Sequence, residues 1–436
     1  MSDARHNGRT GGFFEFRVWR VALCILAFSF FLPARSSLAE EVRLRDLIAE
    51  ALKNSPELRA AESRAAASRY RIPQAKSLPD PMVMIGYQNE GFSRFNYGKS
   101  EDAQVMFSAS QMFPFPGKRG LKAEMAEKDA EGQRASYDAL RLRVVAKVKE
   151  LYFGLFLAYK EIDIIRDRTV LFSRIEDAAI ARYSSGMGVQ QEVLMAQAEK
   201  YMLLEKEEMQ QQKIQAAEAM LNTTVGRQVN APLGRPVETA SGIYTRTLEE
   251  LLRTAMENSP EIRVKERMEA AAEAKVRMAR REYYPDFTVT ANYGMRGGGM
   301  PDMWSLTTTL NIPLYYRAKQ RQAVFEAEAS QAEARGEVEA AKLMLASSIR
   351  DSYSMLSASG RLMELYRDGL IPKTYQDFEA ALAGYVAGKV EAITAISRLK
   401  ALLDFESLYW VQFAEREKAA ARLEALSGLM EPGVKE

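Results

Sequence analysis

The chain has 436 residues and a formal net charge of +2 at pH 7, with a single cysteine, Cys24, and a single histidine, His6. Both lie in an N-terminal segment that we predict is removed, so the mature chain would carry neither a thiol nor an imidazole. That composition excludes cysteine and histidine nucleophiles, disulfides and ordinary zinc sites. The removed segment carries a net charge of +3, which leaves the mature chain near −1, and this balance predicts no nucleic-acid partner.

The first 39 residues have the pattern of a secretory signal peptide. Arg17 and Arg20 precede the apolar run "VALCILAFSFFL", and small residues lead to a predicted cleavage after Ala39. A transmembrane anchor is the alternative, but this run is too short to cross ~30 Å of hydrocarbon as a helix. Leu23 before Cys24 is too bulky for a lipoprotein cleavage site, so we expect no lipid anchor.

Two later stretches, from about Lys118 to Tyr183 and from about Lys319 to Tyr385, are rich in strong helix formers. Each predicts a helix of ~65 residues, which is ~100 Å long. Apolar or small residues in both recur at alternating spacings of three and four, the pattern of a coiled-coil seam. These are Val144, Val148, Leu151, Leu155, Ala158, Ile162 and Ile165, and then Leu345, Ile349, Ser352, Leu356, Ser359, Met363, Tyr366 and Leu370. An ordinary helical bundle would show similar stripes but does not need helices of this length.

The sequence "NSPELRAAESRAA" at 54–66 returns as "NSPEIRVKERMEA" at 258–270. After each copy, a helical pattern runs to a Pro-Asp pair and gives way to alternating apolar and polar residues. Each long helix then ends in a Y-x-x-G turn. We therefore predict two tandem copies of one unit, spanning residues 40–232 and 233–436. Each copy has a helix start at which Asn or Ser can cap free N–H groups and Pro loses no hydrogen bond.

Four short runs, at about 81–90, 103–113, 285–295 and 303–313, alternate between apolar and small or polar residues. Such runs of ~10 residues are typical of membrane barrel strands. We expect the apolar side chains to face lipid, at Val83, Phe107, Phe287, Val289, Trp304 and Leu306. We expect the polar ones to line a wet lumen, at Thr288, Thr290, Ser305 and Thr307. Four strands cannot close a barrel, for which about eight are needed, so several chains must contribute.

Four methionines fall on the lumen side in the same register: Met82, Met84, Met106 and Met112. Their soft thioethers suit Cu(I) or Ag(I) as ligands. The alternative, which we prefer, is that these methionines only fill space in a polarizable wall.

Together, the signal peptide, the repeated helix–hairpin–long helix unit, the Y-x-x-G turns and the stretch "SQMFPFPGKRG" resemble the TolC family of outer membrane efflux proteins. The resemblance covers essentially the whole mature chain and implies a mainly α fold with a membrane β-barrel portion. In that family, three chains form a twelve-stranded barrel on an α-helical periplasmic tunnel. A periplasmic adaptor and an inner-membrane pump complete the conduit. The stretch "FPFPGKRG" is most similar to the branch that serves heavy-metal pumps, which implies a pump of the resistance-nodulation-division type.

The resemblance implies a passive export duct in the outer membrane and no enzyme, so we predict no catalytic residue, no cofactor and no resident metal. The outlet of a type I secretion or drug-efflux system is an alternative, since the sequence does not identify the cargo. A periplasmic coiled-coil scaffold is the alternative of another class, but it would not explain the two-faced strands. A phosphate-binding loop at Gly117-Lys118 is excluded, because Met112 and Arg119 occupy the positions of its first glycine and its Ser or Thr.

The Y-x-x-G turns are the expected periplasmic tips of the tunnel. We predict that they meet the adaptor through Tyr183, Gly186, Val189, Tyr385, Gly388 and Val390. The family's best-known members narrow this mouth with aspartates six and nine residues after the second turn glycine, where this chain has Thr394 and Ser397. Glu192 and Glu391 are the candidate constriction instead, as an acidic ring that attracts cations. The alternative is that both are first-turn acids favoured by the helix dipole.

Overall fold

The computed structural model describes residues 41–238 and 246–428. The predicted signal peptide, residues 1–39, lies outside the described residues. The helices and strands given below all belong to one compact unit that begins at Val42. Within the described residues, we find no helix whose length and apolar character would let it cross a membrane.

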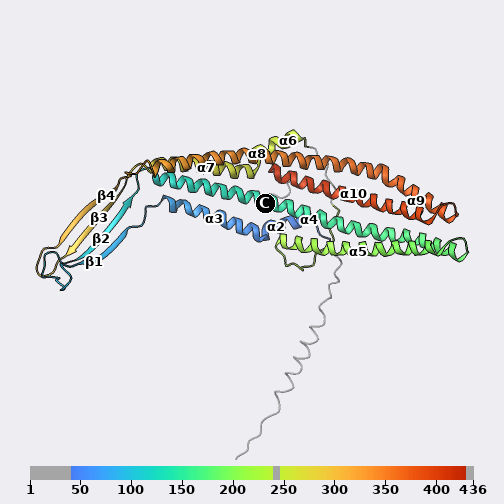
Figure 1. Cartoon of the computed structure of the whole chain (residues 1–436), viewed down its shortest axis with the longest axis horizontal. Coiled ribbons are helices and arrows are strands. Elements are labelled where there is room, and N and C mark those ends of the chain that lie inside the picture. The colour runs from blue at the N-terminus through green and yellow to red at the C-terminus, as the bar shows by residue number, and fades with distance from the viewer. Residues whose placement is uncertain (1–40, 239–245, 429–436) are drawn as a thin grey trace, which may run out of the picture. The chain divides into compact units, whose positions relative to one another are not determined.

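The described chain is mainly helical, as expected, and its two halves present their elements in nearly the same order (Figure 1). The first half contains α2 (Leu44–Asn54), α3 (Pro56–Lys76), β1 (Met82–Gln88), β2 (Gln104–Phe113), α4 (Lys118–Ser184) and α5 (Gln190–Val225). The second half contains α6 (Leu248–Asn258), α7 (Pro260–Arg281), β3 (Asp286–Met295), β4 (Met303–Asn311), α8 (Gln320–Leu365), a π-helix (Tyr366–Leu370), α9 (Ile371–Val386) and α10 (Ala392–Ser427).

The four strands form one antiparallel sheet in the order β1-β2-β3-β4. One row across the sheet, in register, is Ile85, Phe107, Tyr293 and Trp304. The neighbouring row is Met84, Ser108, Asn292 and Ser305. Because side chains alternate between faces along a strand, one face of the sheet is apolar and the other carries small polar residues and methionines. The apolar residues of all four strands therefore share one face of the sheet, and the polar residues share the other.

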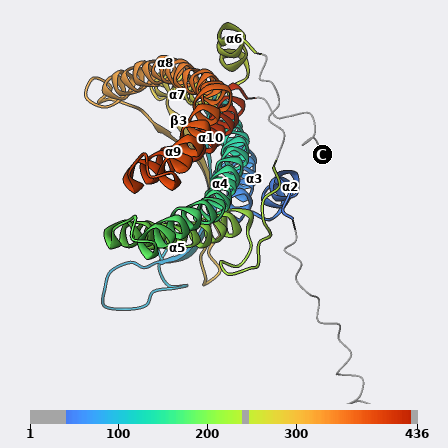
Figure 2. The same ribbon diagram turned by 90° about the vertical axis from the view of Figure 1, so that its right-hand side faces the viewer.

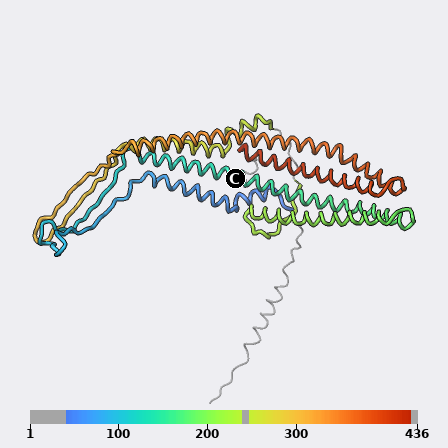
Figure 3. The backbone as a smooth tube through the Cα atoms, in the orientation of Figure 1, coloured from blue at the N-terminus to red at the C-terminus, as the bar shows by residue number. Residues whose placement is uncertain are grey.

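Helix α4 is the element against which both halves pack. It contacts α3 and α5 from its own half and α7 and α10 from the other, and Figures 2 and 3 show these helices running beside it. The predicted seam is buried at Val148, Leu155 and Ile162. The observed helix, Lys118–Ser184, also ends only one residue beyond the predicted boundary.

The second long helix departs from the prediction at one place, the π-helix at Tyr366–Leu370. This turn lies directly before Pro372, which has no N–H and whose ring would collide with the carbonyl one turn earlier. A π turn accommodates such a residue by inserting one extra residue into the helix.

The extra residue shifts the seam. Burial follows the predicted positions as far as Ser359 and then resumes at Phe378, Ala381 and Tyr385. These are each one residue later than an unbroken heptad pattern would place them. The predicted seam residues in between are only half-buried, namely Met363, Tyr366 and Leu370.

The repeated Asn-Ser-Pro motif marks a break between consecutive helices in each half. Ser55 and Ser259 have nearly the same backbone angles, φ −55° and ψ 121° against φ −60° and ψ 120°. Their N–H groups end the preceding helices by donating to the carbonyls of Ala51 and Ala255, at 3.0 and 2.8 Å. The expected side-chain caps are not formed by these two serines. Both are buried, and the following Pro leaves one fewer free N–H at the helix start.

A glycine from the end of a long helix packs on each break. Gly226 follows α5 with φ 85°, and a Cβ there would lie 2.6 Å from the carbonyl oxygen of Asn54. Gly428 follows α10 with φ 72°, and a Cβ there would lie 2.7 Å from the carbonyl oxygen of Asn258. The repeated motif therefore supplies, in each half, the surface on which a long helix ends.

Lys118 joins the start of α4 to the start of β3. It is 2 % exposed, and its Nζ donates to Asp286 Oδ1 at 2.9 Å, to Glu282 Oε2 at 3.2 Å and to the Tyr284 carbonyl at 3.0 Å. The Phe115 N–H donates to the same Asp286 oxygen at 2.7 Å. The stretch "FPFPGKRG" is thus the junction between helix and sheet.

We predict that Gly226→Ala and Gly428→Ala each lower the thermal unfolding midpoint, measured by circular dichroism. An alanine at either position would have to adopt a positive φ, and its methyl group would lie too close to a carbonyl oxygen. Such strain costs about 1–3 kcal/mol. Gly336→Ala is the matched control, because Gly336 is exposed within α8 and has no atom within 4 Å of an added Cβ. It should be neutral or stabilising by up to about 1 kcal/mol, and equal midpoints for the control and Gly226→Ala would contradict the prediction.

We predict that Lys118→Met destabilises the protein by roughly 3 kcal/mol, because it leaves the Asp286 carboxylate without its cation in a largely covered site. The effect should appear as a lower unfolding midpoint and faster proteolysis near the junction. Lys122→Met replaces an exposed lysine on the next turn of α4 and should change stability by no more than about 0.5 kcal/mol. Indistinguishable melts for the two variants would show that the buried ammonium group does not hold the junction.

Candidate functional site

The turns that join α4 to α5 and α9 to α10 have the same backbone structure. Gly186 and Gly388 adopt φ 73° and φ 72°, the left-handed conformation that glycine tolerates best. In the first turn, the N–H of Met187 donates to the Arg182 carbonyl at 2.8 Å. In the second, the N–H of Lys389 donates to the Gly384 carbonyl at 2.8 Å. Each long helix therefore ends in a glycine-terminated motif that satisfies its last carbonyls.

The two turns are joined to each other through Arg182, Tyr385 and Glu192. Arg182 donates from Nη1 to the Tyr385 carbonyl and from Nη2 to the Met187 carbonyl, both at 3.0 Å. Its guanidinium also lies 5.1 Å from the centre of the Tyr385 ring, within reach of a cation–π interaction. The Tyr385 hydroxyl donates to Glu192 Oε2 at 3.0 Å. One residue from each of α4, α5 and α9 thus meets at this end of the helices.

Burial is the main cause that raises the pKa of Tyr385 to about 12, and the hydrogen bond to the Glu192 carboxylate adds to it. The hydroxyl is therefore a neutral donor at physiological pH. Because the folded pKa lies above the ordinary value of about 10, the contribution of this bond to stability is complete below pH 10. It is lost as the pH rises through about 12.

The structure separates the two tyrosines that the sequence treats as equivalent. Tyr183 is 49 % exposed and Tyr385 is fully buried. The one-residue shift after the π-helix turns Tyr385 into the seam. Helix α4 has no such shift, and there the residue before the turn tyrosine, Arg182, is the half-buried one. A buried side chain cannot meet a partner, so the prediction of an adaptor contact at Tyr385 does not fit its position.

The other predicted tip residues remain accessible. Val189 and the two turn glycines are exposed, and Val390 is half-buried. Sequence reasoning missed Arg182, which looks like a solvated residue in "RYSSG". Only its partners in the other half reveal its role.

Glu192 and Glu391 have different environments. Glu192 lies in the first turn of α5, where a carboxylate is favoured by the helix dipole, and it accepts the bond from Tyr385. Glu391 is exposed and is the residue before α10 begins, with no side-chain cap bond. Glu192 thus lies in the first turn of α5 itself, and Glu391 lies directly before the first turn of α10, where the helix dipole also favours a carboxylate.

The strand register places the predicted lumen residues together. Thr290 lies opposite Thr307, and the side chain of Asn292 donates to Ser305 Oγ at 3.1 Å. The same face carries, besides these, Thr288 and the four methionines Met82, Met84, Met106 and Met112. The predicted lipid-facing residues share the opposite face: Val83, Phe107, Phe287, Val289, Trp304 and Leu306.

Comparison with known proteins gives consistent matches over most of the chain. The model of a family described as outer membrane efflux protein matches residues 47–227 and 251–428. The chain is 21 % identical to the cobalt-zinc-cadmium resistance protein CzcC of Cupriavidus metallidurans over 320 residues, which are 72 % of this chain and 74 % of that one. It is 23 % identical to the pyoverdine export outer membrane protein OpmQ of Pseudomonas putida over 415 residues, 88 % of this chain and 86 % of that one.

Among solved structures, CusC superposes with a TM-score of 0.79 at 16 % identity, over 90 % of this chain and 93 % of CusC. At that identity the match shows a shared fold.

We predict that Tyr385→Phe and Glu192→Gln lower stability by non-additive amounts, with a coupling of about 1.5 kcal/mol for a hydrogen bond to a charged group. The coupling is obtained from unfolding midpoints of the two single variants and the double variant. It should be constant between pH 6 and 9 and absent above pH 12, because the Tyr385 hydroxyl ionises at about 12.

Tyr183→Phe is the control for this cycle, since Tyr183 holds the same place in the other turn but is exposed. It should show no coupling to Glu192→Gln. Equal coupling for both tyrosines would mean that the turns are not joined as described.

Proposed function

The chain belongs to the outer membrane efflux protein family, and on that premise we propose that three copies close one membrane barrel above a periplasmic helical tunnel. The protein is an outer membrane efflux channel, and its family works with an adaptor and an inner-membrane pump. The observation that carries the proposal is the sheet, which is two-faced in register but presents β1 and β4 as edges. A bilayer tolerates no open edge, so strands from other copies are needed to complete the ring.

In that ring the apolar face meets lipid and the polar face lines the lumen. Phe287, Val289 and Trp304 lie on the first face and Thr288, Thr290 and Thr307 on the second. Apolar side chains gain by contact with acyl chains, and hydroxyl groups can hydrogen-bond to channel water. The methionines on the lumen face contribute a polarizable wall.

Exposed apolar residues on helices at the margins of the fold support association of several copies. Tyr201 and Leu204 on α5 are exposed, as are Leu343 and Met344 on α8. Large apolar side chains at this density on helix faces are typical of surfaces that bury each other in an obligate oligomer. We propose a homotrimer, in which each copy also contributes two tandem units, residues 40–232 and 233–436. The two separate matches to the family model support the tandem units.

The accessible parts of the two turns are the proposed adaptor contact: Tyr183, Gly186, Val189, Gly388 and Val390. Glu192 and Glu391 are the proposed acidic constriction, with Glu192 already engaged by Tyr385 in this conformation. Threefold symmetry would bring three copies of each carboxylate near the axis, where they favour cations.

Heavy-metal cations are the proposed cargo, delivered by a pump of the resistance-nodulation-division type, and the similarity to a cobalt-zinc-cadmium resistance protein supports this. Export of an organic molecule is the second candidate, supported by the similarity to a pyoverdine export protein over a longer part of the chain.

We predict that a cysteine at Thr290 reacts with a charged aqueous thiol reagent in intact outer membranes, whereas a cysteine at the adjacent Val289 does not. The reason is the alternation of faces, since two cysteines at adjacent positions of one strand point to opposite sides of the sheet. Mass spectrometry of the labelled protein, which should be recovered as a trimer, gives the extent of reaction. The reverse pattern, or recovery with soluble periplasmic proteins, would contradict the proposal.

A further inference from the structure

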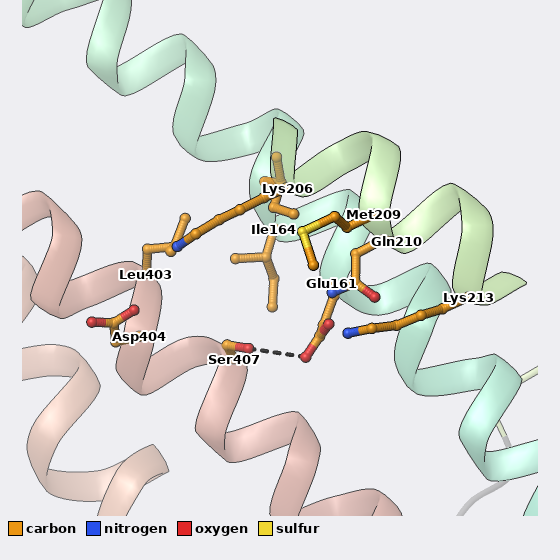
Figure 4. A pocket seen from close by; sticks show the side chains of 10 residues that line it. Glu161, Ile164, Lys206, Met209, Gln210, Lys213, Leu403, Asp404 and Ser407 are labelled. Carbon is orange, nitrogen blue, oxygen red and sulfur yellow. Dashed lines mark hydrogen bonds between the residues drawn. The ribbon is translucent and has the colours of Figure 1, made fainter. Parts of the chain in front are cut away.

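We infer that a groove along α4 binds small anions that also carry hydroxyl groups, namely hydroxycarboxylates; this inference rests on the proposed function. The groove consists of two adjacent cavities of about 320 and 470 Å³ between α4, α5 and α10, which share Glu161, Gln210 and Lys213. We call it the basic groove and define it by Lys147, Glu161, Lys206, Gln210, Lys213 and Asp404. Figure 4 shows the first of the two cavities.

The basic groove lies on the face of α4 opposite to a strap formed by Val42 and residues 235–238. The Tyr152 hydroxyl donates to the Val42 and Val237 carbonyls at 3.1 and 2.7 Å. Arg235 lies over the Tyr159 ring at 5.2 Å. Gly154 and Glu161, which line the groove, each follow one of these tyrosines by two residues. Two residues correspond to about 200° around a helix.

The position of the strap shows which side of the proposed tunnel wall the groove occupies. If the strap lay on the inner side of the wall, it would obstruct the bore. The strap must therefore lie on the outer surface of the proposed tunnel, and the basic groove opens toward the cargo.

The groove contains more positive charges than the carboxylates that line it can balance. Lys147, Lys206 and Lys213 make no ion pair within the described residues. By contrast, Lys418 and Arg422 at the rim of the second cavity are paired with Glu415 and Glu150, at 2.9 and 2.6 Å. Figure 4 shows Lys206 reaching from α5 toward α10, and Lys213 extending beside Glu161. Three ammonium groups thus face two carboxylates, Glu161 and Asp404, which leaves the groove with a net positive charge.

Gln210 gives a second and independent indication of a ligand. The residue as a whole is 9 % exposed and lines both cavities, and its Oε1 has no hydrogen-bond partner among the described residues. A buried carbonyl oxygen without a donor is costly, and native structures rarely leave one unpaired. The ligand should therefore bring a donor to this point. Glu161, which accepts from the Ser407 hydroxyl at 3.2 Å, and Asp404 are further acceptors nearby.

A ligand that satisfies both the lysines and Gln210 must carry carboxylates and a hydroxyl group, as hydroxycarboxylates do. Carboxylates of the ligand pair with the lysines, and a hydroxyl group donates to Gln210 Oε1. Lys206 and Lys213 are two helical turns apart on α5, about 10 Å along the axis, so a ligand that reaches both needs more than one anionic group. A bare divalent cation would be repelled by the three ammonium groups, so this groove favours the second candidate cargo, an organic molecule, over heavy-metal cations.

The test is isothermal titration of the purified full-length channel with citrate and with tricarballylate, which is citrate without its hydroxyl group. Citrate should bind, and tricarballylate should bind about ten-fold more weakly, because it leaves the buried Gln210 oxygen unpaired. The double variant Lys206→Gln/Lys213→Gln should weaken citrate by at least about ten-fold. Gln210→Leu should abolish the preference for citrate over tricarballylate.

Lys53→Gln is the matched control, because Lys53 is an exposed lysine on α2 outside the groove, and it should leave citrate affinity unchanged. Absence of citrate binding by the wild-type protein, or equal affinity in the double variant, would overturn the inference, as would binding of Zn²⁺ alone without citrate. Planar-bilayer conductance separates this inference from the proposed function. If the wild-type channel conducts but does not bind citrate, only the proposed anion binding in the groove is wrong. If the wild-type protein forms no pore, the proposed channel function is wrong.

Discussion

The position at which helix becomes sheet depends on one buried ammonium group. An isolated cation in the protein interior would be prohibitively unfavourable, so the start of α4 is stable only where Asp286, Glu282 and the Tyr284 carbonyl surround Lys118. These acceptors lie more than 160 residues further along the chain, which makes the junction a contact between the two halves. Since α4 runs unbroken from there to Ser184, fixing its start also fixes the level at which the first turn lies.

The two halves use similar sequence signals for different tasks. Both long helices end in the same glycine-terminated turn, yet the π-helix before Pro372 rotates the second one by a residue. Tyr385 consequently enters the core and joins Glu192, while Tyr183 stays at the surface. The turn after α9 can then hold the helix ends together through Tyr385, while the turn after α4 presents the accessible side chain of Tyr183. A small irregularity in a helix thus removes the symmetry that the sequence suggests.

The features that follow from local chemistry could be predicted from the sequence. The bounds of α4, the four strands and their shared faces follow from periodicity and from the placement of Gly and Pro. Three features could not be predicted, because each depends on contacts between distant segments. They are the partners of Lys118, the burial of Tyr385 and the role of Arg182. The π-helix is an intermediate case: Pro372 is visible in the sequence, but an unbroken heptad pattern gives no reason to insert a residue before it.

The composition of α4 reflects three environments around one helix. Its seam, at Val148 and Leu155, is buried against neighbouring helices. Its strap side holds the crossing chain through the Tyr152 hydroxyl and the Tyr159 ring. Its third side, at Glu161, is polar and lines the basic groove. A helix with a single apolar stripe would satisfy only the first of these. In the proposed tunnel, the wall is sealed between helices and wet along its bore, which accounts for polar residues on that third side. Their particular charges are then what can distinguish one channel's cargo from another's.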